Sequence, residues 1–522
     1  MTEQQETRAR AEQAVKAKRR SGWAGVAGVA VALGMTEFFA GFTVDIPSAI
    51  SAIGSYVVDA SPAWLKTFAI SAFGTSDKAV LAISIFIVAL VIGFFLGKAS
   101  VKRPLPMFIG FTIAGLVGFA AQLTQPGVSG PLAFASTLVS MGIGLLTWFG
   151  IKQWTDVPSR DVTDNDVTDI ARRRLVMGLA GAATVTVIAI GVGRGRIRSR
   201  AEAQRAALNL AEPVEVALEP TDAHDFGVAG VSPIVVGNAT FYRIDTALVV
   251  PTIDPEDWTL RIHGMVDEEV ELKYSDIAFM PLVERYATLS CVSNEVGDNL
   301  VGNALWTGVM LRDILNMAGV QSGAEQIVGR SIDGFTAGFP KEYAFDDRDA
   351  MLVIGMNREV LPANHGFPAR LVVPGLYGYV SATKWLTEIE VTTWDGFDGY
   401  WIPRGWSKQG PIKTQSRIDR PRNRSKIEAG VFTLGGVAWA PTKGIDMVEV
   451  QIDGGPWQVA ELTDPLSDNS WIQWKLDADM AAGEHIVSVR ATDATGFTQG
   501  SVEVSPRPDG AEGWHTIRLL AE

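Results

Sequence analysis

The first two hundred residues alternate long apolar runs with short polar segments. Each long run approaches the roughly 20 residues that cross the hydrocarbon core of a bilayer. These runs lie at residues 21–43, 79–97, 105–123, 131–150 and 175–193. A weaker segment at 46–70, broken by Pro47, Asp59, Pro62 and Lys66, reads as an external loop or an interfacial helix. The pattern predicts an α-helical membrane domain of about five helices.

Basic residues indicate the orientation of these helices. They gather in the N-terminal tail, at 98–103 and at 172–174. Because Lys and Arg in short loops favour the cytoplasmic side, we expect all three segments to face the cytoplasm. Five spans then place the rest of the chain outside. The basic run Arg194, Arg196, Arg198 and Arg200 conflicts with this orientation, and six spans would resolve the conflict by returning the chain inside.

The arginines at 172–174 stand directly before the fifth apolar run. They look like an internal twin-arginine export signal, which would carry a folded domain across the membrane. An ordinary cytoplasmic anchor is the alternative, and either interpretation puts Arg172 inside. We therefore predict a multi-pass plasma-membrane protein whose C-terminal domain is extracytoplasmic.

The apolar runs contain no histidine and no cysteine, since the first histidine is His224. A haem held by His or Cys between these helices is therefore excluded. Glu37 is the one carboxylate well inside a run. An ionisable residue within a membrane is a functional candidate, here for quinone or partner contact. Glu37 could equally lie near the outer interface.

The second part of the chain changes to shorter elements. Residues 258–266 alternate as a half-buried strand, and 311–318 read as a helix, which favours an α+β domain. After residue 426 come alternating strands and the hairpin signal Asp453-Gly454-Gly455, which predict an immunoglobulin-like sandwich. The predicted parts are a basic cytoplasmic tail 1–20, a membrane domain 21–193, a linker 194–232, an α+β domain 233–425 and a sandwich 426–522.

The net charge and the cysteine count exclude several kinds of partner and site. The net charge of −13 argues against nucleic acid as a partner. Cys291 is the only cysteine in 522 residues, so an intrachain disulfide and a Cys-pair zinc site are both excluded. It ends the strand-like stretch 286–291. A lone cysteine is by default a small buried hydrophobe.

The residues around and after Cys291 favour a different role. They include Cys291-Val292-Ser293-Asn294, Trp306-Thr307-Gly308, His365-Gly366-Phe367-Pro368-Ala369-Arg370 and Lys384-Trp385-Leu386. This ordered set resembles the molybdenum-cofactor domain of the sulfite oxidase family, over roughly the last three hundred residues. The resemblance implies that the Cys291 thiolate binds molybdenum beside the dithiolene of a pyranopterin. A soft thiolate suits such a metal.

The resemblance also implies a set of site residues. Cys291 would be the metal ligand and, with Arg243, catalytic. The cofactor-binding residues would be Phe241, Tyr242, Arg243, Asp245, Asp333, His365, Arg370, Ser381, Ala382, Thr383 and Lys384. Simpler alternatives are an exposed arginine for Arg243, a structural ion pair for Arg370 and a turn residue for His365. The chain has one residue more than the family pattern between Gly378 and Lys384.

The chain also departs from the family pattern. Ile244-Asp245 stands where the family often has Asn-His, and Phe335 where sulfite oxidases have a tyrosine near the metal. Glu295-Val296 stands where two arginines are common, which makes the pocket less hospitable to a dianion. The cofactor site is therefore expected to be kept and the sulfite site to be altered.

Together these features predict a membrane-anchored, sulfite oxidase-like molybdopterin oxidoreductase. We expect oxygen-atom transfer on a small oxyanion or sulfoxide-type substrate, with electrons exchanged with a separate carrier, either a cytochrome or quinone-linked. The sandwich resembles the family's dimerisation domain, so a homodimer is possible. The alternative is a non-catalytic membrane-bound binding or assembly module that kept the fold. A transporter is disfavoured because the apolar runs hold almost no charge.

Overall fold

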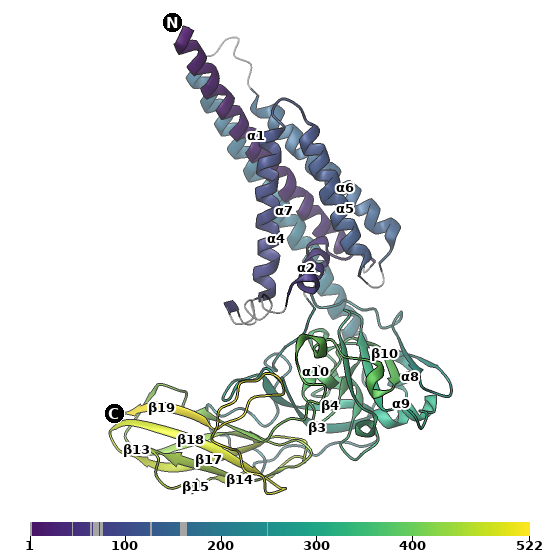
Figure 1. Cartoon of the computed structure of the whole chain (residues 1–522), viewed down its shortest axis with the longest axis vertical. Coiled ribbons are helices and arrows are strands. Elements are labelled where there is room, and N and C mark those ends of the chain that lie inside the picture. The colour runs from purple at the N-terminus through teal and green to yellow at the C-terminus, as the bar shows by residue number, and fades with distance from the viewer. Residues whose placement is uncertain are drawn as a thin grey trace. The chain divides into compact units, whose positions relative to one another are not determined.

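The computed structural model describes residues 3–43, 45–62, 65, 72–73, 77–125, 128–156, 164–247 and 249–522. They form two compact units, each described by itself. The helical unit comprises Met1–Ala203 with Ala247–Thr252, and the strand-rich unit comprises Gln204–Thr246 with Ile253–Glu522 (Figure 1).

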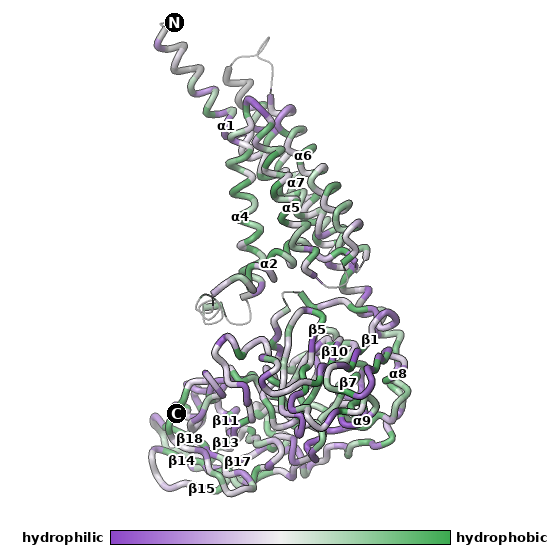
Figure 2. Tube along the Cα trace, turned by 45° about the vertical axis from the view of Figure 1, so that its right-hand side comes forward, coloured by the Kyte–Doolittle hydropathy of each residue, from purple (hydrophilic) through white to green (hydrophobic). Residues whose placement is uncertain are grey.

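The helical unit is built from apolar helices. Its elements are α1 (Glu3–Ala40), α2 (Ala49–Ala60), α4 (Asp77–Ala99), α5 (Leu105–Leu123), α6 (Gly130–Thr155) and α7 (Asp164–Ala206). Among the described residues, five of these helices, all except α2, are long and apolar enough to cross a membrane, in agreement with the predicted five (Figure 2). The short α2 lies in the predicted weak segment 46–70, of which 63, 64 and 66–70 fall outside the described residues.

Glycines set the packing of these helices. α1 packs against α4 and α6, and a Cβ on Gly25 would overlap the backbone of Gly93 on α4. Large apolar side chains point outward instead, with Ile83 58% and Phe95 61% exposed. Lipid-facing bulk and small residues between helices are typical of membrane bundles, where close backbone approach replaces hydrophobic burial as the source of packing energy.

The end of α1 meets the basic stretch of α7. Glu37 is buried, accepts a hydrogen bond from the Ser48 hydroxyl and lies 3.5 Å from the Arg194 guanidinium. Arg196 stacks 4.2 Å from the ring centre of Phe42. Two arginines of the basic run that conflicts with the five-span orientation thus bind to partners inside the helical unit.

A valine at Gly193 is expected to destabilise the helical unit. A Cβ there would overlap the carbonyl group of Glu37, whereas a Cβ on Gly191 of the same helix would have no heavy atom within 4 Å. Overpacking of this kind costs about 1–3 kcal/mol. Thermal unfolding of Gly193→Val and Gly191→Val in detergent checks this. Equal melting temperatures would contradict the close α1–α7 contact.

The first part of the strand-rich unit contains two sheets. One has the order β2-β1-β10-β5-β6, and the other β3-β4-β7-β8 with β9 also paired to β7. The strands are β1 (Thr259–Gly264), β2 (Val270–Lys273), β3 (Val283–Ser290), β4 (Val301–Met310), β5 (Gln326–Ser331), β6 (Thr336–Pro340), β7 (Met351–Met356), β8 (Glu359–Val360), β9 (Arg370–Val372) and β10 (Leu386–Thr392). Short helices join them: α8 (Tyr274–Ala278), α9 (Leu311–Ala318), η2 (Lys341–Ala344), η3 (Ala363–His365), α10 (Gly378–Ser381), η4 (Trp394–Gly396) and η5 (Ile402–Arg404). The domain is α+β, as predicted.

The second part is a sandwich of two antiparallel-rich sheets, β11-β13-β17-β16 and β12-β19-β18-β14-β15. Its strands are β11 (Gln415–Arg420), β12 (Ser425–Ile427), β13 (Gly430–Trp439), β14 (Ile445–Ile452), β15 (Gln458–Val459), β16 (Glu461–Leu462), β17 (Ile472–Met480), β18 (Gly483–Asp493) and β19 (His515–Ala521). The inner faces bury Leu434, Val448, Trp474 and Val489. The predicted immunoglobulin-like sandwich is confirmed.

Two element boundaries differ from the predicted parts. α7 continues to Ala206, into the stretch predicted as a linker from 194, because that stretch is rich in helix-forming Ala, Arg, Glu and Gln. The sandwich includes β11 from Gln415, ahead of the predicted start at 426. The reason is the β11–β13 ladder, which no local pattern reveals.

Candidate functional site

Cys291 stands where the buried strand β3 ends. It opens a loop of residues 291–300, called the cysteine loop below, that leads into β4. The base of the loop is closed by two hydrogen bonds: the Cys291 N–H donates to the Leu300 carbonyl at 2.9 Å, and the Leu300 N–H donates to Asn294 Oδ1 at 2.7 Å. The half-buried thiol lies 2.9 Å from the Ser293 hydroxyl. The fold thus fixes the backbone on both sides of the sulfur.

Arg370 begins β9 and is buried. Its Nη1 donates to the His365 carbonyl at 3.0 Å, and its guanidinium lies 5.1 Å from the ring centre of Trp306 on β4. Among the described residues it has no carboxylate partner, so the predicted alternative of a structural ion pair finds no support. A buried cation without an anion is costly, which points to an anionic ligand.

His365 lies next to this arginine. Its Nε2 is 2.8 Å from the Asn238 carbonyl, which can only accept, so Nε2 carries the hydrogen and Nδ1 is free to accept. The imidazole meets the Phe241 ring edge-on at 5.7 Å. A neutral imidazole whose Nδ1 carries no hydrogen is suited to receive a donor group of a ligand.

Arg243, Asp245 and Lys384 form one charged cluster. The Asp245 carboxylate, whose side chain is 3% exposed, lies 2.8 Å from Arg243 Nε and 3.0 Å from Lys384 Nζ. Lys384 also donates to the Asn364 carbonyl at 3.4 Å. Asp245 therefore orients two cations, which leaves the cluster with a net positive charge.

An aromatic pair lies beside these residues. Phe241 stacks on Tyr242 with ring centres 5.2 Å apart and meets Trp306 edge-on at 5.7 Å. Gly302 on β4 makes room for this stack, since a Cβ there would lie 2.9 Å from the Phe241 ring. Burial raises the pKa of Tyr242, and the nearby Cys291 thiol raises it further, so its phenol stays protonated.

Of the predicted residues Ser381, Ala382 and Thr383, the first ends α10 and the other two follow it. The Ser381 hydroxyl donates to the Tyr377 carbonyl at 3.1 Å, and the Thr383 hydroxyl to the Gly329 carbonyl at 3.4 Å. All three are buried. The Ser381 and Thr383 hydroxyls give their hydrogens to the protein backbone, so toward a ligand they could act only as acceptors.

Asp333 occupies the turn after β5. Its carboxylate accepts hydrogen bonds from the Thr246 hydroxyl at 3.1 Å and from the Phe335 N–H at 3.2 Å. Phe335 packs against Tyr400 with ring centres 6.0 Å apart. Asp333 thus ties this turn to the segment that carries Asp245.

Burial dominates the electrostatics of the site. It lowers the pKa of His365 to about 4, of Lys384 to about 8 and of Arg370 to about 10, and it raises the pKa of the Cys291 thiol. Each shift reflects the cost of removing a charged form from water. A bound anion would offset that cost for Lys384 and Arg370.

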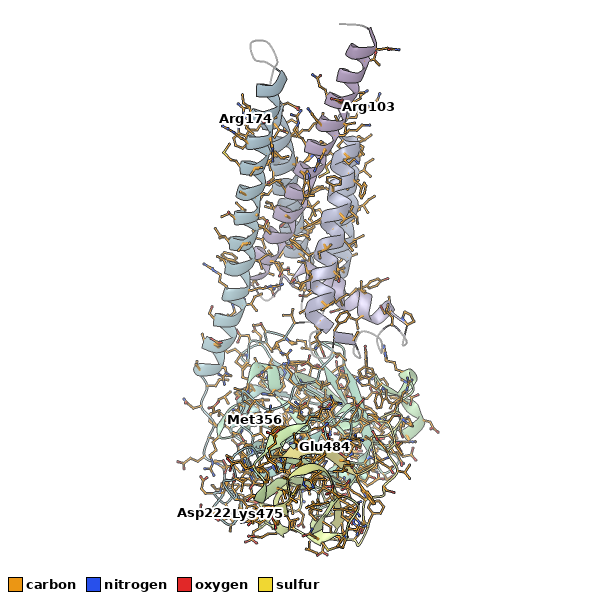
Figure 3. All side chains as sticks on the ribbon, turned by 90° about the vertical axis from the view of Figure 1, so that its left-hand side faces the viewer. Arg103, Arg174, Asp222, Met356, Lys475 and Glu484 are labelled. Carbon is orange, nitrogen blue, oxygen red and sulfur yellow. The ribbon has the colours of Figure 1, made fainter. Side chains whose placement is uncertain are left out.

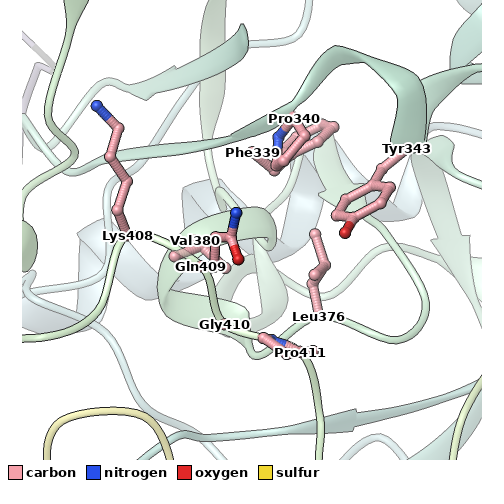
Figure 4. A pocket seen from close by; sticks show the side chains of 9 residues that line it. All are labelled: Phe339, Pro340, Tyr343, Leu376, Val380, Lys408, Gln409, Gly410 and Pro411. Carbon is pink, nitrogen blue, oxygen red and sulfur yellow. The ribbon is translucent and has the colours of Figure 1, made fainter. Parts of the chain in front are cut away.

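Two cavities lie elsewhere in the strand-rich unit. One, of about 30 Å³, is lined by Phe339, Tyr343 and Lys408 among others (Figure 4). It has room for about one water. The other, of about 370 Å³, is lined by Arg348, Lys413 and further residues of both parts of the unit. Cys291 lines neither cavity, so neither defines the candidate site.

Comparisons with known proteins agree on one domain. Residues 247–401 match the family model of the oxidoreductase molybdopterin binding domain. The chain is 27% identical to mitochondrial sulfite oxidase of Homo sapiens over 325 residues, which cover 52% of this chain and 59% of that protein. It is 28% identical to nitrate reductase [NADH] of Hordeum vulgare over 314 residues, covering 48% of this chain and 34% of that protein.

The chain carries a molybdopterin-binding oxidoreductase domain that is similar to sulfite oxidase. It spans less than two thirds of the length of these curated relatives. Among solved structures, sulfane dehydrogenase SoxCD from Paracoccus pantotrophus is similar, with a TM-score of 0.49 and 21% identity over 60% of this chain and 88% of that one.

The side chains present fit the cofactor of a molybdopterin domain. Cys291 offers the soft sulfur that molybdenum favours. Arg370 supplies a planar guanidinium without a carboxylate partner, which suits phosphate. Asn294 Nδ2 and Thr307 Oγ1 are buried without a partner among the described residues. When bound, the group would supply two-electron oxygen-atom transfer chemistry. The role of the protein would be to hold it, orient it and limit access of water.

Two residues that contact the candidate site were not predicted as site residues from the sequence. Trp306 contacts both Arg370 and Phe241, and Asn238 accepts from His365. Trp306 lies inside the motif Trp306-Thr307-Gly308, so its place in that motif could have indicated a role in the site. Asn238 acts through its backbone carbonyl, which every residue type has, so the sequence cannot reveal this contact.

Proposed function

We propose that the protein is a membrane-anchored molybdenum-cofactor oxidoreductase. It transfers an oxygen atom to or from a small oxyanion or sulfoxide-type substrate outside the cytoplasm and exchanges electrons with a separate carrier. The observation that carries the proposal is the placement of the only cysteine at the end of β3, in a molybdopterin-binding domain that also holds a buried arginine without a carboxylate partner.

The roles of the site residues follow from their contacts. Cys291 would bind molybdenum, while Arg370 and His365 would hold the pterin and its phosphate. Arg243 and Lys384, oriented by Asp245, would add positive charge on the same side. Such fixed charges stabilise an anionic substrate or developing negative charge without reorganisation.

The helical unit supports an extracytoplasmic site. Arg103, before α5, and Arg174, in the first part of α7, lie at the same end of this unit (Figure 3). If that end faces the cytoplasm, five spans carry the chain after α7 to the other side. The contacts of Arg194 and Arg196 with Glu37 and Phe42 weaken the case for a sixth span. Export through the twin-arginine pathway stays a prediction.

The substrate preference differs in our proposal from that of a sulfite oxidase proper. Phe335 has no hydroxyl to donate, and Glu295 is an exposed carboxylate on the cysteine loop. Both features disfavour a dianion. Sulfoxides, sulfite and nitrate form the first substrate screen, nitrate because a nitrate reductase is among the similar proteins.

Metal and pterin analysis of the full-length protein tests the proposal. Protein purified from cells that synthesise the molybdenum cofactor should contain about one molybdenum and one pterin per chain. It should also turn over at least one substrate of the screen with an artificial electron donor or acceptor. If correctly folded protein contains neither molybdenum nor pterin, the alternative of a non-catalytic binding module replaces the enzyme.

A further inference from the structure

The sandwich contacts the cysteine loop through two side chains. Arg417 of β11 donates from Nη1 to the Asp298 carbonyl at 2.8 Å. His515, the first residue of β19, packs so closely against Gly297 that a Cβ on this glycine would overlap the imidazole ring. Gly297 has φ +82°, a conformation that glycine adopts without strain. The tip of the loop is thus held from outside the molybdopterin domain.

Both side chains are themselves held firmly. Arg417, 8% exposed, lies 2.6 Å from the Asp419 carboxylate and donates to the Ser232 hydroxyl at 2.9 Å. His515 Nδ1 accepts from the Ile418 N–H at 2.9 Å, so Nε2 carries the hydrogen of the neutral ring. Burial lowers the pKa of His515 to about 4 and so favours this neutral form. Neither group can follow the loop if the loop moves.

The loop needs this external support. Its base is closed by the hydrogen bonds of Cys291 and Leu300, but Glu295, Asp298 and Asn299 at the tip are exposed. The Asp298 N–H donates to the Glu295 carbonyl, which makes a local turn without fixing its direction. The contacts with Arg417 and His515 fix that direction.

We propose that Arg417 and His515 are positioning residues that hold the cysteine loop, and with it the Cys291 sulfur, in the geometry of the metal site. The sandwich is then a part of the metal-site scaffold and more than a packing or dimerisation module. The link to the metal rests on the proposed function, whereas the link to the position of the thiol does not.

The test uses the only cysteine of the chain as its own reporter. In full-length protein made without molybdate, the alkylation rate of Cys291 by iodoacetamide measures how often the loop opens. Arg417→Met should raise this rate about tenfold, because it removes a charge-assisted hydrogen bond to the loop. Arg417→Lys should restore part of the protection, and Gly297→Ala should raise the rate with Arg417 still present.

Arg420→Met is the matched control. Arg420 lies on the same strand and donates to the carbonyls of Thr433 and Ala229, but it does not contact the loop. Its alkylation rate should stay within about twofold of the unsubstituted protein while its melting temperature falls like that of Arg417→Met. Equal rates for Arg417→Met, Gly297→Ala and Arg420→Met would overturn the proposal.

Molybdenum content separates the two hypotheses. In molybdate-replete protein, Arg417→Met should hold less metal than Arg420→Met. If the unsubstituted protein contains no molybdenum, the proposed function fails, but the alkylation rates still decide whether the sandwich positions the thiol.

Discussion

Serine in place of Cys291 is expected to abolish turnover while the protein stays folded. Serine has nearly the same size, its hydroxyl can replace the thiol as the partner of the Ser293 hydroxyl, and the other loop hydrogen bonds of residue 291 use its backbone. Its hydroxyl is a hard, weakly acidic donor that cannot replace a thiolate at a soft metal. Loss of residues that merely support metal ligands costs about 10–100-fold, so loss of the ligand should exceed hundredfold in activity.

Ser293→Ala is the control for Cys291→Ser. It removes the one side-chain hydrogen bond to the thiol among the described residues and leaves the sulfur in place. We expect a reduction well below hundredfold. Molybdenum content, pterin content and melting temperature are measured beside activity for both variants. Wild-type activity in Cys291→Ser would exclude this residue as the metal ligand.

Methionine at Arg370 is expected to deplete the cofactor without destabilising the protein. The guanidinium is buried, bonds backbone carbonyls and has no carboxylate partner among the described residues. Without a bound anion, this buried charge destabilises the folded protein. A methionine of similar length should therefore leave the apoprotein equally stable or more stable. Pterin content should fall at least about tenfold, because a charge-assisted contact to an anion is lost.

The Arg370→Met variant is informative because its pterin content should fall while the stability of its apoprotein stays the same or rises. Arg330→Met serves as the control, since Arg330 is paired with Glu390 and should lose a little stability while it keeps the cofactor. Arg370→Lys should retain part of the cofactor, because it keeps the charge but not the planar fork. A large loss of stability with full pterin content in Arg370→Met would show that the arginine is structural.

The sequence predicts those features that depend on local pattern. The apolar run 105–123 coincides with α5, because a bilayer-length apolar segment has one stable conformation in lipid. The hairpin signal at 453–455 lies between β14 and β15, where Asp453 and Gly454 adopt positive φ. The Cys291 motif likewise falls at a strand end, since the buried run before it has strand character.

Features that depend on distant partners were not predictable in this way. Asp245 stands where the family often has a histidine, and its role as a bridge between Arg243 and Lys384 depends on a residue 139 positions away. The contact of Arg417 with Asp298 joins two parts of the fold that sequence patterns treat as separate domains. Long-range pairing of this kind is set by tertiary packing, not by local composition.

The contacts between α1 and α7 have a consequence for biogenesis. Gly34 meets Thr186, Gly41 meets Gly193, and Glu37 pairs with Arg194, so the first long apolar helix closes on the last. A nascent chain leaves the buried Glu37 carboxylate without its cation until α7 has been synthesised, and a buried unpaired charge is unfavourable. Completion of the bundle therefore coincides with emergence of the segment that leads into the catalytic half.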